Sequence, residues 1–240
     1  MTPIRLVAFD LDDTLYPERA FVASGFRAVA EYLVRAHLAD RPIADDLQTA
    51  FDAGIRGRTF DHVLAACGIE PNEKLIRDLV RIYRSHRSPY GARRPEIALY
   101  PDADRALADL EACGLRRALV SDGPLEAQQA KVEALGLADR LDAVVLTDAW
   151  GRQFWKPHPR AFRQLADRFG LTPGECLYVA DNPAKDFQGP AEAGWRPSVR
   201  VRRKDGLHRD APLSDPGQVC ATVQGLGDLA GFIESLSRSD

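Results

Sequence analysis

The sequence predicts an α/β fold, in which a parallel sheet carries helices on both faces and a helical segment is inserted near the N-terminus. Short apolar runs of strand length alternate with helical patterns through most of the 240 residues. This alternation is typical of parallel sheets, because each strand needs a crossover before the next one. Only residues 19–96 depart from it. We therefore expect a sheet-based core formed by residues 1–18 and 97–240.

Five apolar runs are predicted to be strands. They are RLVAFD at 5–10, RRALVSD at 116–122, LDAVVLTD at 141–148, CLYVAD at 176–181 and RPSVRVR at 196–202. Helices are expected over 102–114, 124–136, 159–170, 183–194 and 225–240. Four of these helices are followed by a glycine, which suits a C-terminal cap with positive φ: Gly114, Gly136, Gly170 and Gly194. Residues 203–218 are polar and rich in turn formers, so we expect a mobile surface loop.

The insert over residues 19–96 is predicted to be helical. It contains long periodic runs, such as FVASGFRAVAEYLVRAHL and PNEKLIRDLVRIYRSHR, and no convincing strand. Prolines at 89, 95 and 101 then mark the return to the alternating pattern. We place the boundary of the insert near residues 95–100.

Composition and charge limit the partners and the location that we expect. The net charge of −3 gives no general attraction to nucleic acid, and no apolar run approaches the ~20 residues that cross a bilayer. The N-terminus lacks the features of a signal peptide, so a cytoplasmic location is expected by default. Four scattered cysteines lack a CxxC spacing, and we interpret them as core residues: Cys67, Cys113, Cys176 and Cys220. The oligomeric state stays open.

Polar residues follow three of the predicted strands. The first strand is followed by Asp10, Asp12, Asp13 and Thr14, the second by Ser121, Asp122 and Gly123, and the fourth by Asp181, Asn182 and Asp186. Lys156 lies between the third and fourth strands. Ligands bind beyond the carboxyl ends of parallel strands, so these side chains are expected to converge. Clustered carboxylates repel one another unless a cation or proton relieves them, and Mg²⁺ prefers such oxygen ligands together with substrate phosphate oxygens. A Mg²⁺ site for a phosphorylated substrate is therefore predicted.

Four motifs in this chain resemble those of the haloacid dehalogenase superfamily of hydrolases. They are DLDDTL (DxDxT), VSDG with its motif serine, KPHPRAF (KPxPxxF) and VADNPAKDFQGPAEAGW (GDxxxxDxxGAxxAG). The motifs occur in the family's order and cover residues 1–16 and about 98–200. The resemblance implies a Rossmann-like catalytic core. It also implies that residues 19–96 form an α-helical cap of the C1 type, which would close over the site.

The resemblance further implies roles for the carboxylates. Asp10 would be the nucleophile and a metal ligand. Asp12 would be the general acid and base, and its backbone carbonyl would also meet the metal. Asp181 would bind Mg²⁺, Asp186 would hold the metal shell, and Thr14 would brace the nucleophile loop.

The remaining motif residues would contact the substrate. Ser121 would hydrogen-bond a phosphoryl oxygen, and Lys156 would steady the nucleophile and the transferring group. Asp122 and Gly123 complete the expected substrate loop, although Asp122 occupies a variable motif position. The family commonly has glycine where this chain has Ala180, and we expect that change to be tolerated.

Three arginine-containing stretches are candidates for substrate or partner contacts. The turn AGIRGRTFD could bring Arg56 and Arg58 to an anionic substrate, or they could lie in solvent. A solvated helix face is expected for Arg77, Arg81 and Arg84. A charged sheet edge is expected for Arg200, Arg202, Arg203 and Lys204.

The sequence thus predicts a Mg²⁺-dependent phosphatase that acts on a small phosphorylated metabolite through an aspartyl-phosphate. Asp12 favours a phosphatase, because family members that remove halide usually lack this second motif aspartate. A sugar phosphate and a nucleoside monophosphate suit the insert equally. The alternatives are a phosphomutase of the same family, a non-catalytic protein that senses a phosphorylated ligand, and a haloacid dehalogenase.

Overall fold

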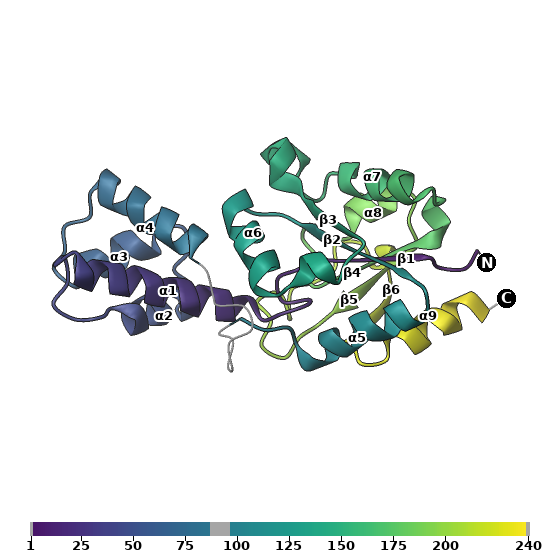
Figure 1. Cartoon of the computed structure of the whole chain (residues 1–240), viewed down its shortest axis with the longest axis horizontal. Helices are drawn as coiled ribbons and strands as arrows, with labels where there is room; N and C mark the ends of the chain where they lie inside the picture. Colours follow the sequence, from purple (N-terminus) through teal and green to yellow (C-terminus); the bar gives the residue numbers. More distant parts are fainter. Residues whose placement is uncertain (1, 87–96, 239–240) are drawn as a thin grey trace. The chain divides into compact units, whose positions relative to one another are not determined.

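The computed structural model describes residues 2–86 and 97–238, and the chain divides into two compact units (Figure 1). The core unit comprises Met1–Glu18 and Ala98–Asp240, and the helical unit comprises Arg19–Ile97. Two of the boundary prolines, Pro89 and Pro95, lie outside the described residues. In the part of the chain that is described, no helix is long and apolar enough to cross a membrane.

A six-stranded parallel sheet forms the centre of the core unit, which confirms the predicted α/β fold. The strand order is β3-β2-β1-β4-β5-β6. The strands are β1 (Leu6–Phe9), β2 (Arg116–Ser121), β3 (Ala143–Leu146), β4 (Cys176–Ala180), β5 (Ser198–Val201) and β6 (Val219–Val223). β1 lies in the middle, where Leu6 pairs with Arg116 on one side and Cys176 on the other. All four residues of β1 are buried, as expected for a parallel strand covered on both faces.

Helices cover both faces of the sheet. They are α5 (Pro101–Ala112), α6 (Leu125–Ala134), α7 (Arg160–Phe169), α8 (Gln188–Glu192) and α9 (Leu229–Arg238). α5 and α9 lie along one face, and α7 and α8 along the other (Figure 1). The glycines predicted to cap helices have positive φ, as at Gly170 (φ 62°). α8 is shorter than predicted, because residues 182–186 form a turn in which the Asn182 N–H donates to the Asp186 carboxylate over 2.9 Å.

An aromatic cluster fills the core between α7 and β4. Phe162, Tyr178 and Trp195 are buried, and Phe162 makes edge-to-face contacts with both others, with ring centroids 4.9 and 5.3 Å apart. Burial of each such ring stabilises the fold by roughly 1.5–3 kcal/mol. The cluster also fixes the Tyr178 hydroxyl beneath the carboxyl end of the sheet.

The helical unit contains α1 (Glu18–Arg35), α2 (Ala44–Asp52), α3 (Thr59–Ala66) and α4 (Glu73–Ser85). Phe26 is buried among aromatic rings of three helices, with Phe51, Phe60 and Tyr83 at centroid distances of 5.7–6.2 Å. Gly25 lets α4 approach α1, since a Cβ there would lie 2.5 Å from the Tyr83 ring. Arg77 and Arg81 on α4 are exposed and pair with acidic residues of the same helix, as on a solvated face.

The segment after β5 differs from the prediction. β6 was not predicted, and it places β5 inside the sheet rather than at its edge. Arg200 and Arg203 are only 5% and 6% exposed, so their interpretation as edge charges was wrong. Arg200 donates to the carbonyls of His208 (3.0 Å) and Ala211 (2.7 Å), which ties residues 203–211 to the sheet. The prediction of a mobile loop is therefore wrong for residues 203–211.

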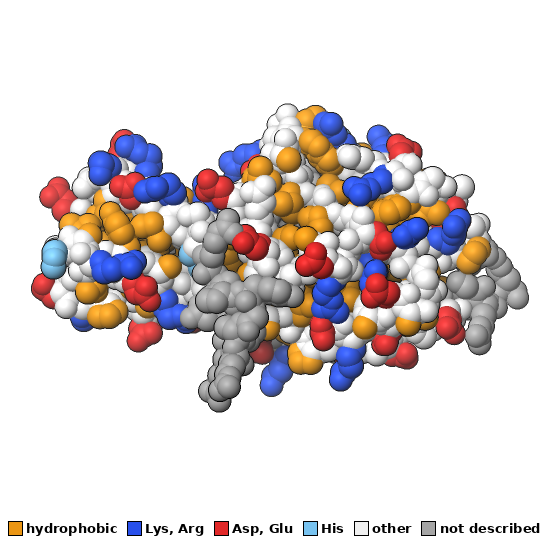
Figure 2. Space-filling view, viewed as in Figure 1, with side chains coloured by type: hydrophobic (Ala, Val, Ile, Leu, Met, Phe, Trp, Pro, Cys, Tyr) orange, Lys and Arg blue, Asp and Glu red, His pale blue; other side chains and the backbone are white. Residues whose placement is uncertain are grey.

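The cysteines also differ from the prediction. Cys176 is buried in β4, whereas Cys67 is half-buried and Cys113 and Cys220 are exposed. All four are free thiols. Because only Cys176 is buried, the interpretation of the cysteines as core residues is correct for Cys176 alone. On the face drawn in Figure 2, acidic and basic side chains are interspersed over the core unit.

Candidate active site

The predicted site residues of the core unit meet at the carboxyl ends of β1, β2 and β4. From β1 the sheet extends through β2 to β3 on one side and through β4 to β6 on the other. The strand order therefore reverses direction between β1 and β4. In open parallel sheets a crevice forms beyond the carboxyl ends of the strands at this point, and ligands bind there. Asp10 directly follows β1, and Asp181 directly follows β4. The sheet topology therefore brings these two carboxylates together from distant parts of the sequence.

Asp10, Asp181 and Asp186 form a buried carboxylate triad. One carboxylate oxygen from each lies within 4.8 Å of the others, and the three residues are 4%, 5% and 0% exposed. Burial and the neighbouring charges of Asp10 and Asp186 raise the pKa of Asp181 to about 9. Burial also raises the pKa of Asp10, to about 6, against the opposing charge of Lys156. Such a triad is costly without additional positive charge, which a bound cation would supply.

Lys156 contributes a buried ammonium group to this triad. Its Nζ lies 2.6 Å from an oxygen of Asp10 and 2.7 Å from an oxygen of Asp186, and it donates to the Tyr178 hydroxyl over 3.0 Å. Burial acts to lower the pKa of Lys156, but Asp10 and Asp186 raise it well above its ordinary value. The residue therefore holds a fixed positive charge against Asp10.

Asp12 faces a partner that the sequence analysis missed. Lys131 on α6 donates to both Asp12 oxygens, over 2.6 Å to Oδ1 and 2.9 Å to Oδ2, and the Tyr16 hydroxyl also donates to Oδ1. Burial acts to raise the pKa of Asp12, but these contacts hold it below its ordinary value. One signal in the sequence could have revealed Lys131, because it shares a helix face with small apolar residues at Ala127 and Ala134. A lysine on such a face needs a buried partner.

The residues after β2 form the predicted substrate loop. Ser121 is 1% exposed, and its hydroxyl donates to the Gln128 side chain over 3.0 Å. Gly123 has a φ of 122°, and a Cβ at this position would lie 2.6 Å from the amide of Gln128. Glycine is therefore required for the tight turn from β2 into α6.

The Asp122 carboxylate is engaged by the protein. Oδ1 accepts from the Thr147 hydroxyl over 2.6 Å and from the backbone N–H of Lys156 over 3.1 Å. Oδ2 lies 3.5 Å from the Lys185 ammonium. These contacts favour a structural role, in which Asp122 braces the loop that carries Lys156. A substrate contact from this side chain stays a prediction.

The loop after β1 is fixed by three further hydrogen bonds. Asp13 has a φ of 51°, and its carboxylate accepts from the backbone N–H groups of Glu18 (3.0 Å) and Leu207 (2.8 Å). Thr14 is fully buried, and its carbonyl accepts from Arg203 over 2.8 Å. The nucleophile loop is therefore held by the segment that follows β5, which the sequence analysis had described as mobile.

Arg56 and Arg58 belong to the helical unit. The Arg56 guanidinium stacks 3.6 Å from the Phe51 ring centroid and donates to the Phe51 carbonyl, whereas Arg58 is exposed and lies 3.7 Å from Asp61. Their predicted substrate contacts stay untested.

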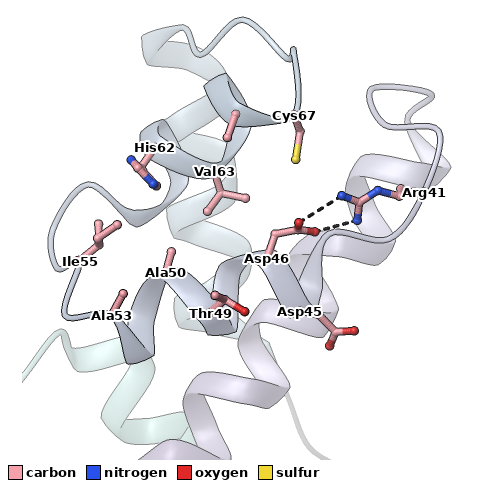
Figure 3. A pocket seen from close by; sticks show the side chains of 11 residues that line it. Arg41, Asp45, Asp46, Thr49, Ala50, Ala53, Ile55, His62, Val63 and Cys67 are labelled. Carbon is pink, nitrogen blue, oxygen red and sulfur yellow. Dashed lines mark hydrogen bonds and ion pairs between the residues drawn. The ribbon is translucent and has the colours of Figure 1, made fainter.

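A cavity of about 460 Å³ lies between α2 and α3 of the helical unit, and the Arg41–Asp46 ion pair forms part of its lining (Figure 3). It contains no residue to which the sequence analysis assigned chemistry.

Comparison with known proteins places the chain among hydrolases. A family model described as haloacid dehalogenase-like hydrolase matches residues 4–194. Glyceraldehyde 3-phosphate phosphatase of Methanopyrus kandleri is 31% identical over 213 residues, which cover 86% of this chain and 87% of the relative. Phosphoserine phosphatase of Thermus thermophilus is 34% identical over 167 residues, with coverages of 70% and 61%.

The fold is also similar to solved structures. The HAD-hydrolase YfnB of Bacillus subtilis, solved bound to magnesium, matches with a TM-score of 0.66 and 18% identity over 97% of this chain and 99% of that one. At this identity the likeness supports the fold alone.

Proposed function

This chain belongs to the haloacid dehalogenase-like hydrolase family, and we propose that it hydrolyses small phosphate monoesters in a Mg²⁺-dependent reaction through an aspartyl-phosphate on Asp10. The resemblance found in the sequence is thereby confirmed at the level of the family. Its phosphatase relatives support phosphoric monoester hydrolysis as the reaction. The observation that carries the proposal is the buried Asp10 carboxylate, which contacts Lys156 over 2.6 Å and belongs to the carboxylate triad.

Charge balance supports a divalent cation in this site. When ionised, Asp10, Asp181 and Asp186 carry three negative charges, of which the ammonium of Lys156 neutralises one. The two charges that remain match a divalent cation, and carboxylate oxygens are the ligands that Mg²⁺ prefers. Bound Mg²⁺ would be held by these three carboxylates and would supply positive charge to the transferring phosphoryl group.

In the first step, an Asp10 oxygen attacks the phosphorus atom and the bond to the leaving oxygen breaks. Lys156 orients the Asp10 carboxylate and balances charge on the phosphoryl oxygens. The leaving oxygen takes a proton from the carboxyl of Asp12, which must first become protonated against the Lys131 contact that lowers its pKa, and the product alcohol departs. The Ser121 hydroxyl, which donates its single proton to Gln128 in this structure, would turn to donate that proton to a phosphoryl oxygen when substrate binds.

In the second step, Asp12 accepts a proton from a water molecule as that water attacks the aspartyl-phosphate. The bond between the phosphorus atom and the Asp10 oxygen then breaks. Inorganic phosphate is released, and the Asp10 carboxylate and protonated Asp12 are restored.

The helical unit is the cap in this proposal. Its place in the sequence, between the nucleophile loop and β2, supports this role. Arg56 and Arg58 are its proposed substrate contacts. The named relatives act on different small phosphates, and both a sugar phosphate and a nucleoside monophosphate stay candidates for this chain.

Phosphate release tests the proposal. The wild-type protein, Asp10→Asn and the exposed control Asp109→Asn are assayed on triose, sugar, amino-acid and nucleoside phosphates, with Mg²⁺ and with EDTA. We expect activity that needs Mg²⁺ and Asp10 but not Asp109, together with acid-stable label on the protein after a rapid quench with ³²P substrate. Full activity in Asp10→Asn would refute the proposed nucleophile. Halide release from an added 2-haloacid, without metal, would instead indicate a dehalogenase.

A further inference from the structure

Lys185 brings a further ammonium group to the active site, and the reaction proposed above does not use it. The residue belongs to the turn over residues 182–186, which follows β4. Within this turn the backbone N–H groups of Lys185 and Asp186 both donate to the Asn182 carbonyl, over 3.3 and 3.1 Å. The backbone of Lys185 is therefore fixed next to the carboxylate triad.

The strand order shows where the Lys185 side chain lies. Its Nζ is 3.5 Å from Oδ2 of Asp122, which follows β2, whereas Lys185 itself follows β4. β1 lies between these two strands. Neighbouring strands are about 4.8 Å apart, so β2 and β4 are separated by about 10 Å. The Lys185 side chain therefore reaches across the carboxyl end of β1, the strand that Asp10 directly follows.

The charge of Lys185 acts on the proposed nucleophile. Burial raises the pKa of Asp10, and the charge of Lys156 and, more weakly, that of Lys185 oppose this rise. This interaction agrees with the position that the strand order gives to the Lys185 ammonium.

The Lys185 ammonium is accessible to a ligand, unlike that of Lys156. Three protein oxygens lie within 3.0 Å of the Lys156 Nζ, as many as it has N–H groups, and its side chain is 0% exposed. The Lys185 side chain is 33% exposed, and among the residues that the structure describes its Nζ contacts only Asp122. That contact is not a hydrogen bond, since Oδ2 of Asp122 has no hydrogen-bond partner in the described part of the chain. Lys185 therefore keeps N–H groups that can bind an anion.

The position of this ammonium fits a phosphoryl group. Asp122 directly follows Ser121, the proposed phosphoryl contact, and Asp10 is the proposed nucleophile. A phosphoryl group that meets both would lie beneath the Lys185 side chain. In phosphoryl transfer the negative charge is spread over three non-bridging oxygens, and an ammonium group that reaches one of them donates a charge-assisted hydrogen bond.

We propose that Lys185 binds the transferring phosphoryl group by donating from its ammonium to one of the non-bridging oxygens. This inference rests on the proposed phosphatase function. Lys185 keeps its protons throughout, so it contacts the substrate while Lys156 orients Asp10. Lys185 was not among the predicted site residues, because it occupies a variable position between the two aspartates of the last motif.

Inorganic phosphate is the probe, because it contains the transferred group and nothing else. Its binding is measured by isothermal titration calorimetry at saturating Mg²⁺ in the wild type, Lys185→Met, Lys185→Arg and the exposed control Lys204→Met. Lys185→Met should raise the Kd for phosphate about 10-fold, as expected for loss of one charge-assisted hydrogen bond at a partly exposed position. Lys185→Arg should recover part of this loss, since it keeps a cation, and Lys204→Met should leave the Kd unchanged.

Mg²⁺ binding separates this role from a merely structural one. Lys185 is next to Asp186 in the sequence, so a substitution that distorted the turn would weaken Mg²⁺ binding as well. Loss of a phosphoryl contact should instead leave the Kd for Mg²⁺ unchanged or lower it, because a positive charge is removed from the neighbourhood of the triad. Parallel losses of Mg²⁺ and phosphate affinity, or an unchanged Kd for phosphate, would overturn the inference.

Lys185→Gln repeats the test with a neutral polar side chain, which suits a partly exposed position even where methionine prevents folding. With the best substrate of the panel, kcat/KM should fall about 10-fold in both neutral variants. A loss with this substrate but not with phosphate would place the contact on the rest of the substrate and contradict the inference. A wild-type protein that neither binds phosphate nor releases it from any substrate would refute the proposed function itself.

Discussion

Replacement of Lys156 by methionine is expected to destabilise the metal-free protein strongly. The Lys156 side chain is 0% exposed, and its ammonium lies 2.6 Å from Asp10 and 2.7 Å from Asp186. Methionine fills a similar volume but leaves both carboxylates in a buried site without this cation. Loss of one partner from a buried ion pair costs about 3–5 kcal/mol, because an uncompensated charge stays buried.

The corresponding change in Tm is large enough to measure simply. In a chain of this size, 1 kcal/mol shifts Tm by roughly 2–4 °C, so Tm should fall by about 6–20 °C. Differential scanning calorimetry in EDTA measures the shift. Lys74→Met is the control, since Lys74 is 84% exposed and lies 3.5 Å from Asp78 in a surface pair that contributes about 0–1 kcal/mol.

A double-mutant cycle with Asp10→Asn tests the cause. If the loss comes from a buried charge without its partner, Asp10→Asn should partly restore the stability of Lys156→Met, with a coupling free energy of about 1–3 kcal/mol. Asp186 stays charged, so recovery should be incomplete. Additive effects of the two substitutions, or a Tm for Lys156→Met equal to that of the wild type, would refute this reasoning.

Three further results are expected. Mg²⁺ at 100 times its Kd should add about 2.7 kcal/mol to the free energy of unfolding of the wild type and so raise its Tm, whereas Asp181→Asn should show no such rise, as measured by calorimetry. Partial burial acts to raise the pKa of Asp102, but the Arg203 hydrogen bond holds it below its ordinary 3.8. This contribution to stability is present above that pH and is lost as pH falls through the lowered pKa, so Arg203→Met should destabilise more near pH 7 than near pH 2 in urea unfolding. Gly189→Ala should destabilise by about 1–3 kcal/mol, because its Cβ would lie 2.6 Å from a carbonyl of the KPxP loop, whereas Gly174→Ala meets nothing within 4 Å and should be neutral in the same assay.

The sequence predicted the sheet and the convergence of the acidic residues for a simple physical reason. Strands buried on both faces are short apolar runs, and the residues that follow parallel strands meet at one edge. Asp10 and Asp181 could therefore be placed together without knowledge of any tertiary contact. The roles of these residues came from the family resemblance, and they stay proposals that the experiments above address.

The sequence did not predict which groups the buried polar side chains would contact. Lys131 meets Asp12, which lies 119 positions away, and no local pattern encodes that distance. Arg200 and Arg203 were predicted to be charges on a sheet edge, but Arg200 is satisfied by the nearby Ala211 carbonyl and Arg203 by the Asp102 carboxylate at the start of α5, which lies 101 positions away. β6 was not predicted because its residues are only partly buried, so the strand carries too weak an apolar pattern to be recognised in the sequence.

The central position of β1 has a consequence for the order of folding during synthesis. β1 is the first strand to be made, yet Leu6 finds its hydrogen-bond partners only at Arg116 and Cys176. Meanwhile, Arg19–Ile97 form a contiguous helical unit that can gather its own apolar residues as soon as it emerges. The apolar LVAF segment therefore has no strand partner during the time in which the helical unit, which follows it in the sequence, is made and folds. The nucleophile loop waits longer still, because the N–H of Leu207 that holds Asp13 is made near the end of the chain.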